Sequence, residues 1–274
     1  MRVNELNFQD KIETEITKND VVYSARHLRK AFGNHVVIGD ISFDMHKGEV
    51  ILLEGRNGSG KTTLINMLTG NIEPDQGEIF ISINDKTQKF IFPKKWWQNL
   101  NIFHRYTPEK LSWNGINRVW QDIRLFPTMT TLENVSVAAP NQRGENPLFA
   151  LSQFNTGKQE QENIKESMDL LEKVGLGDRL DSSCDKLSLG QTKRVAIARA
   201  LKTGSKILFL DEPLAGLDKN GVEEIISYLK IIAREHLVTL VIVEHVFNIP
   251  VIKDFADTVW ALSEGKLIIN PVNQ

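Results

Sequence analysis

The stretch GRNGSGKTT at Gly55–Thr63 decides the fold, because it fits the phosphate-binding pattern G-x-x-x-x-G-K-[ST]. The apolar run Glu49–Glu54 before it predicts a buried strand, and Lys61–Leu68 after it predicts a helix. Glycines let such a loop turn tightly and aim its N–H groups at phosphate oxygens, where the following helix N-terminus adds positive charge. The residues predicted to bind the phosphates are Gly55, Arg56, Asn57, Gly58, Ser59, Gly60, Lys61, Thr62 and Thr63.

Two side chains of this loop carry chemistry. Lys61 can bridge the β- and γ-phosphates of a nucleotide as a point charge, and the Thr62 hydroxyl can ligate Mg²⁺. The alternative is a glycine-rich turn between a strand and a helix that contains a lysine by chance. The strand pattern before the loop and the helix pattern after it favour the phosphate site.

The composition is that of an ordinary globular protein. The 274 residues are 41% hydrophobic and 25% charged, with a formal net charge of −2, so we expect no nucleic-acid partner. Cys184 is the single cysteine, which excludes a disulfide within the chain and suits a reducing compartment. The first residues lack the apolar core of a signal peptide, and apolar runs such as Leu237–Val243 are too short to span a bilayer.

Strands alternate with helices along the chain, which predicts an α/β fold with a mostly parallel sheet covered on both faces. The predicted strands are Val21–Leu28, Val36–Phe43, Glu49–Glu54, Glu78–Ile83, Gly115–Asp122, Lys206–Leu210 and Leu237–Val243. The predicted helices are Lys61–Leu68, a short one opened by the T-x-x-E capping pattern at Thr130–Glu133, Lys158–Val174, one from Ser188 to about Lys202, and Lys219–Glu235 capped by Asp218.

We expect residues 1–20 to form a polar N-terminal tail and residues 21–274 one domain. Within this domain, we expect a helical subdomain, inserted in the core, over about 123–187. The stretch 84–114 is irregular and rich in aromatic residues. That stretch is either a partner-specific insertion or an elaborated sheet edge. Its tryptophans and lysines also allow a platform for single-stranded nucleic acid, which the lack of a basic excess elsewhere disfavours.

Charged residues follow two of the predicted buried strands. Asp211 and Glu212 come directly after Lys206–Leu210, at the carboxyl end where α/β sheets bind their ligands. One carboxylate there can hold Mg²⁺, and a second can accept a proton from an attacking water. His245 follows Leu237–Val243 in the same way. Alone, each residue fits a solvated or structural role, but the phosphate loop favours a functional one.

The string LSLGQ at Leu187–Gln191 lies about 20 residues before Asp211. This layout resembles the ABC ATPase family, the nucleotide-binding subunits of ABC transporters, from about Val22 to Ile269. The resemblance implies a P-loop NTPase (RecA-like) parallel-sheet core with an antiparallel β subdomain and an inserted α-helical subdomain.

The resemblance also implies roles at the catalytic positions. Gly55–Thr62 matches the Walker A loop, and Gln121 matches the Q-loop glutamine that touches Mg²⁺ and the attacking water. Asp211 matches the Walker B aspartate, Glu212 the catalytic carboxylate and His245 the switch histidine that contacts the γ-phosphate. The implied Mg²⁺ ligands are therefore Thr62, Gln121 and Asp211, and the implied cofactors are ATP and Mg²⁺.

Three further segments match the family. The signature motif corresponds to Ser188, Leu189, Gly190 and Gln191, which the resemblance places against the ATP of a second cassette. Asp218 ends a D-loop-like AGLD string. Phe32 lies where an aromatic residue stacks on adenine, although it also fits a turn aromatic packed on the sheet edge.

Two features point to one branch of the family. Leu189 stands at the middle of the signature motif, where glycine is commonest. The string VIVEH leads up to the switch histidine, His245, which is its last residue. Both resemble the branch that includes branched-chain amino-acid importers and the lipopolysaccharide-extracting ATPase.

The family implies two protein partners: a membrane-spanning permease subunit, and a second ABC ATPase subunit in a homo- or heterodimer. It implies a cytoplasmic location, peripheral on the inner face of the cell membrane. The alternative is an ABC-type ATPase of a soluble assembly, for example in iron–sulfur cluster building. A P-loop kinase would leave LSLGQ unexplained.

Overall fold

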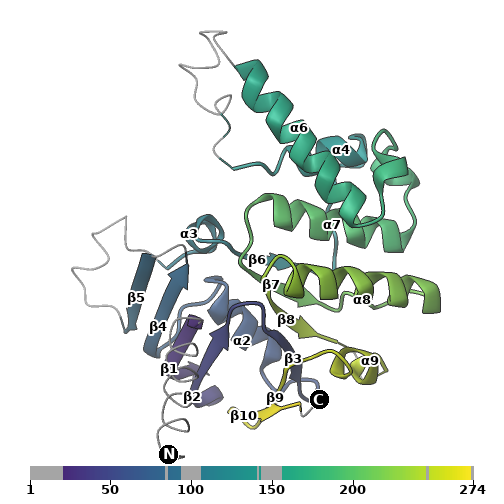
Figure 1. The fold of residues 1–274 in the computed structure, drawn as a ribbon. Helices are drawn as coiled ribbons and strands as arrows, with labels where there is room; N and C mark the ends of the chain where they lie inside the picture. Colours follow the sequence, from purple (N-terminus) through teal and green to yellow (C-terminus); the bar gives the residue numbers. More distant parts are fainter. Residues whose placement is uncertain are drawn as a thin grey trace, which may run out of the picture.

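Two sheets and a layer of helices make up the part of the chain that this computed structural model describes, residues 21–83, 86–93, 106–140, 142, 156–244 and 247–272 (Figure 1). The antiparallel sheet, in the order β2-β1-β4-β5, contains β1 (Val21–Phe32), β2 (His35–His46), β4 (Gln76–Ile83) and β5 (Lys86–Phe92). The larger sheet, in the order β10-β9-β3-β8-β7-β6, contains β3 (Val50–Glu54), β6 (Ile116–Val119), β7 (Ile207–Asp211), β8 (Thr239–Val243), β9 (Thr258–Ser263) and β10 (Lys266–Pro271).

The larger sheet is parallel from β9 to β6, as the alternation of strands and helices predicts, and only β10 pairs antiparallel. Its central strands are buried on both faces. In β3, for example, Val50 and Leu52 enter one core cluster while Ile51 and Leu53 enter the other. Continuous apolar runs are what a strand covered on both faces requires.

The helices are α2 (Lys61–Leu68), α3 (Pro108–Trp113), α4 (Thr131–Ser136), α6 (Thr156–Lys173), α7 (Leu189–Lys202), α8 (Lys219–Arg234) and α9 (Ile249–Lys253). Helices cover both faces of this sheet, whereas α4 and α6 pack with α7 in a separate cluster. α2 packs in the cluster between the two sheets, and α8 and α9 pack on the opposite face. α7 contributes to two clusters, because Ile197 contacts the sheet while Val195 and Ala198 contact α4 and α6.

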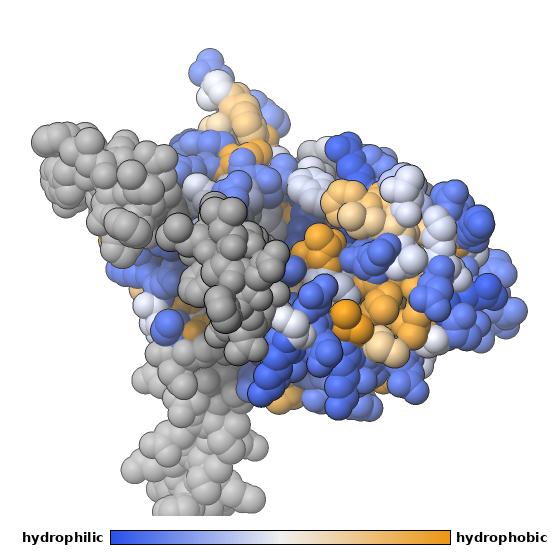
Figure 2. All heavy atoms as spheres, turned by 90° about the horizontal axis from the view of Figure 1, so that it is seen from above, coloured by the Kyte–Doolittle hydropathy of each residue, from blue (hydrophilic) through white to orange (hydrophobic). Residues whose placement is uncertain are grey.

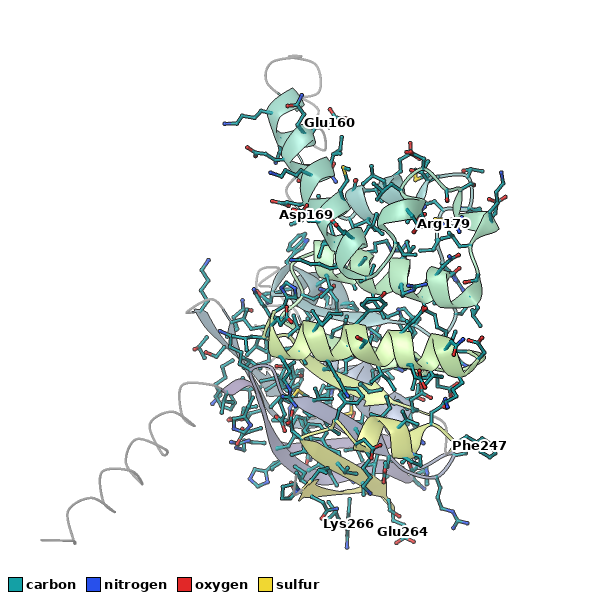
Figure 3. All side chains as sticks on the ribbon, turned by 45° about the vertical axis from the view of Figure 1, so that its right-hand side comes forward. Glu160, Asp169, Arg179, Phe247, Glu264 and Lys266 are labelled. Atoms are coloured by element: carbon teal, nitrogen blue, oxygen red, sulfur yellow. The ribbon has the colours of Figure 1, made fainter. Side chains whose placement is uncertain are left out.

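The helical layer lies at one end of the molecule. α6 projects farthest from the sheets and carries Glu160 and Asp169 along its length (Figures 1 and 3). On the face seen from above, apolar residues are exposed in patches between hydrophilic ones (Figure 2).

The predicted helix caps at Thr130, Ser188 and Asp218 are confirmed, and the helix predicted from Lys158 begins two residues earlier, at Thr156. Thr130 and Glu133 form a capping box at α4, and Asp218 Oδ1 accepts a hydrogen bond from the Gly221 N–H at α8.

The stretch 84–114 contains two elements that the sequence did not predict, β5 and α3. Within its described part, Phe90 and Phe92 of β5 pack edge-on against Tyr106, with their ring centroids 5.0 Å and 5.3 Å, respectively, from that of Tyr106.

Three further elements, β9, β10 and α9, were also not predicted, and the expected strand Gly115–Asp122 shortens to β6. The predicted tail and Trp96, Trp97 and Phe103 lie outside the described residues.

Candidate nucleotide-binding site

The glycine-rich loop joins β3 to α2 and folds tightly on itself. Gly60 caps α2 with a φ of 101°, a left-handed conformation that favours glycine. A Cβ on Gly55 would lie 2.5 Å from both the Leu262 carbonyl oxygen and Ser59 Oγ, so no side chain fits there. Since the first residues of α2 have N–H groups without helical partners, loop and helix together present donors suited to phosphate.

Lys61 folds back over this loop. Its Nζ donates hydrogen bonds to the carbonyl oxygens of Gly55 at 2.6 Å and Arg56 at 3.1 Å. Burial lowers the pKa of Lys61, while the carboxylates of Glu212 and Asp211 oppose this shift. The ammonium group therefore lies in the field of the two carboxylates that follow β7.

These groups border a cleft of about 680 Å³, which we call the nucleotide cleft. Its lining contains Gly55, Arg56, Asn57, Lys61, Glu212, Val243, Glu244 and Ile249. Gly58 is an exposed residue of the same loop, and Thr62 and Thr63 lie in the first turn of α2.

Parallel strands bring Asp211 and Glu212 to the same edge of the sheet as the loop. Asp211 Oδ2 accepts a hydrogen bond from Arg118 Nη2 at 2.5 Å, and Gln121 Nε2 donates to Glu212 Oε2 at 2.8 Å. The structure thus brings together four of the predicted catalytic and metal-binding residues, Lys61, Gln121, Asp211 and Glu212.

Glu212 has a strained backbone that its neighbours hold in place. Its φ is 50°, in the left-handed region that residues with side chains rarely occupy. Its N–H donates to the Val243 carbonyl oxygen at 2.8 Å. Lys193 Nζ donates to the carbonyl oxygens of Glu212 at 3.0 Å and Ala215 at 2.7 Å.

Lys193 is a residue of this site that the sequence did not predict. It lies on α7 and is only 5% exposed. Burial lowers the pKa of Lys193, and the nearby carboxylates of Glu244 and Glu212 oppose that shift. Glu244, 6% exposed, was also missed and accepts a hydrogen bond from the Leu214 N–H at 2.5 Å. The backbone after β7 is therefore held by two buried charged side chains.

The LSLGQ segment forms a capped helix N-terminus. Ser188 Oγ accepts from the Gln191 N–H at 3.2 Å, and Gln191 Oε1 accepts from the Ser188 N–H at 2.9 Å. Leu189 begins α7 with its side chain half exposed, and Gly190 follows it. Among the residues that the structure describes, none of 188–191 lines the nucleotide cleft. One chain therefore does not bring this segment to its own phosphate loop.

Three further predicted residues lie outside the cleft or outside the described chain. Phe32 is 51% exposed at the end of β1, and Lys30 Nζ lies 5.5 Å from its ring centroid. Asp218 is exposed and caps α8. His245 is not among the described residues, so its role stays a prediction. Phe247, two positions later, extends away from the molecule (Figure 3).

The oxygen donors at the cleft fit Mg²⁺. The Thr62 hydroxyl and the Asp211 carboxylate are the hard ligands that this ion prefers. The described residues contain no cluster of three His, Cys, Asp or Glu side chains that would hold a metal by themselves. Nucleotide phosphates and water would complete the coordination, as is usual for Mg²⁺ in phosphate sites.

A second hollow of about 890 Å³ lies between β6, the segment that follows it, the end of α4, and α7. We call it the α4–α7 groove. Its exposed apolar side chains include Trp120, Phe126 and Val137. Arg199 of α7 lines it without a hydrogen bond or ion pair to any described residue, and burial lowers the pKa of this guanidinium.

Loop, sheet and cleft define a P-loop nucleotide-binding protein of the α/β class. Comparison with known proteins sharpens this class. A family model described as "ABC transporter" matches residues 38–215. A probable branched-chain amino acid transport ATP-binding protein, LivG of Methanocaldococcus jannaschii, is 30% identical over 90% of this chain and 88% of its own length.

Solved structures agree with the sequence relatives. An ATP-binding cassette of an ABC transporter in its ADP conformation has a TM-score of 0.70 and 27% identity, covering 92% of this chain and 91% of that one. The cbiO1 protein of Clostridium perfringens, described as part of the transporter complex cbiONQ, has a TM-score of 0.73 and 29% identity, with 92% and 89% covered. The chain belongs to the ABC transporter family, and its fold is that of the ATP-binding cassettes, as the sequence predicted. The LivG relative also agrees with the branch that the sequence indicated.

Replacing Lys193 tests whether its hydrogen bonds matter for chemistry. Lys193→Met keeps the length of the side chain but removes both bonds to the carbonyls, so we expect kcat for ATP hydrolysis to fall about tenfold, equivalent to about 1.4 kcal/mol. Lys193→Gln keeps a donor and should retain more activity. Lys202→Met is the matched control, because Lys202 is equally buried on α7 but bonds to Asn163 and Glu166 of α6. A wild-type kcat in Lys193→Met would show that the hydrogen bonds of Lys193 do not matter for hydrolysis.

Proposed function

We propose that this protein is the ATP-hydrolysing subunit of an ABC transporter and that two cassettes close around ATP to drive a membrane-spanning partner. The observation that best supports the proposal is that the predicted site residues lie in two separate places on the folded chain. Lys61 and Glu212 line the nucleotide cleft, with Asp211 next to Glu212 in the chain and Gln121 hydrogen-bonded to it, while the capped N-terminus of α7 lies outside the cleft. One copy thus holds the two halves of an ATP site apart.

The cleft residues suit hydrolysis of the γ-phosphate. Lys61 places its ammonium group against the phosphates, and Glu212 orients an attacking water and accepts its proton. Gln121 holds the Glu212 carboxylate through the 2.8 Å hydrogen bond. Thr62 and Asp211 would hold Mg²⁺, which would supply positive charge to offset the charge developing on the phosphates.

The N-terminus of α7 supplies the other half from a second molecule, either another copy or a related cassette. Free N–H groups and the helix dipole attract an anion at this position. Ser188 adds a hydroxyl and Gly190 leaves room for the close approach of a phosphate. ATP then bridges the two cassettes, and loss of the γ-phosphate removes the bridge, so hydrolysis becomes an opening motion.

The α4–α7 groove is the proposed dock for the membrane-spanning subunit. Its half-exposed apolar side chains suit a short amphipathic segment, and Arg199, which pairs with none of the described residues, suits a carboxylate on it. None of the described helices is both long and apolar enough to cross a membrane. A cassette of this kind acts from the cytoplasmic side, at the inner face of the membrane, through its partner. The relatives' names favour transport over the alternative of a soluble assembly.

Glu212→Gln tests the catalytic carboxylate. The amide cannot accept the proton, so we expect the hydrolysis rate to fall at least about 100-fold while ATP binding persists. With ATP and Mg²⁺ the variant should elute as a dimer in size-exclusion chromatography. Glu223→Gln, an exposed change on α8, is the control and should behave as wild type. Normal hydrolysis by Glu212→Gln would remove this residue as the base.

Ser188→Arg tests the contribution in trans. A long cationic side chain at the N-terminus of α7 should block dimer closure, yet leave the nucleotide affinity of a single copy within about twofold of wild type. Asn220→Arg places the same side chain in the exposed first turn of α8 and should leave closure intact. An equal loss of closure and of single-copy binding would argue against the role in trans.

Purification from detergent-solubilised membranes separates transport from the soluble alternative. We expect a polytopic membrane protein to accompany the wild-type chain and to stimulate its ATPase after reconstitution. Phe126→Asp, in the α4–α7 groove, should abolish this association without changing ATP affinity. A complex with soluble cluster-building proteins and none with a membrane protein would favour the alternative.

A further inference from the structure

Arg118 is a buried arginine that joins three elements around the nucleotide cleft. It lies on β6, and its side chain is only 5% exposed. Its Nη1 donates to Asn66 Oδ1 of α2 at 2.7 Å, and its Nη2 donates to Asp211 Oδ2 of β7 at 2.5 Å. The guanidinium carbon lies 3.6 Å from the centroid of the Trp120 ring.

These contacts connect the two elements that carry the proposed Mg²⁺ ligands. Asn66 lies four residues after Thr62, so both side chains project from the same side of α2. Asp211 ends β7. The planar fork of an arginine can hold a helix amide with one nitrogen and a carboxylate with the other, which the single ammonium of a lysine cannot do in the same geometry.

The contact leaves the second carboxylate oxygen of Asp211 available. Arg118 engages Oδ2, whereas Oδ1 has no hydrogen-bond partner among the described residues. The Asp211 side chain is 23% exposed, so water can reach it. Arg118 thereby fixes the orientation of the carboxylate and leaves one oxygen for the ion or its water.

The third contact reaches the α4–α7 groove. Trp120 lines that groove, and its side chain is half exposed there. Arg118 Nε is buried and has no hydrogen bond to any residue that the structure describes. The guanidinium is therefore oriented by Asn66, Asp211 and the stacked ring of Trp120, and a shift of that ring would change the guanidinium position.

We propose that Arg118 is a positioning residue that holds the Asp211 carboxylate at a fixed place relative to the first turn of α2 for Mg²⁺–nucleotide, and that its stacking on Trp120 makes this placement depend on the wall of the α4–α7 groove. The inference deepens the proposed function and rests on it. A residue that supports a metal ligand typically changes metal affinity by at least tenfold when it is removed.

The test compares ATP binding with excess Mg²⁺ and with EDTA, measured by calorimetry on the full-length chain. In Arg118→Met we expect the gain in affinity that Mg²⁺ gives to fall about tenfold, with the affinity in EDTA within about twofold of wild type. Arg118→Lys should be intermediate. Asn66→Ala should lower the gain less, and should add little to Arg118→Met because both act through one bridge.

The neighbouring arginine is the matched control. Arg124 is exposed and contacts only Asp122 among the described residues, so Arg124→Met should leave the gain from Mg²⁺ unchanged. Trp120→Phe keeps a ring for stacking and should preserve the gain, whereas Trp120→Ala should lower it.

Several outcomes would overturn the inference. An unchanged gain from Mg²⁺ in Arg118→Met would do so, and so would an equal loss of affinity with Mg²⁺ and with EDTA, which marks a purely structural residue. Should Arg118→Met not fold, Asn66→Ala and Arg118→Lys test the inference through the same ratio, the ATP affinity with Mg²⁺ divided by the affinity in EDTA. Failure of the proposed function looks different, because the wild-type chain itself would then bind no ATP.

Discussion

The parallel register of β7, β8 and β3 is the constraint on which the site depends. Because these strands run in the same direction side by side, their carboxyl ends meet at one edge of the sheet. The phosphate loop, the Asp211–Glu212 pair and Glu244 all leave the sheet at this edge. Each strand has five residues and is buried on both faces, so a slip of one residue would exchange the two core layers.

The elements that build this edge could be predicted from the sequence, and the outer elements could not. Lys206–Leu210 and Leu237–Val243 are apolar runs bounded by polar residues, and β7 and β8 agree with them within two residues. β5 was missed because its first half, KTQK, is polar and only its last residues are apolar. α3 had a usable signal, since Thr107 caps it and Pro108 follows at its first position.

The residues of the candidate site likewise fall into those that the sequence could predict and those that it could not. Gln121, Ser188 and Asp211 could be named because each belongs to a local motif. Lys193 and Arg118 could not, because their function lies in partners 19 to 93 residues away along the chain. A lysine inside an apolar helix also fits a side chain that extends along the surface to water. Only the folded chain shows Lys193 pointing inward to two backbone carbonyls.

α7 explains why the two halves of the proposed composite site belong to the same chain. Ser188 caps its N-terminus, and Lys193 follows about 140° around the helix axis. The first turn of α7 is therefore open to a partner, while Lys193 in the next turn donates a hydrogen bond to the backbone carbonyl of Glu212. A tilt of α7 that brings Ser188 toward another molecule's phosphate must move Lys193 as well, since a helix transmits such a tilt as a rigid body. In the proposed dimer, closure of one ATP site would therefore shift the backbone of Glu212 at the other, which gives a physical reason for the two sites to act together.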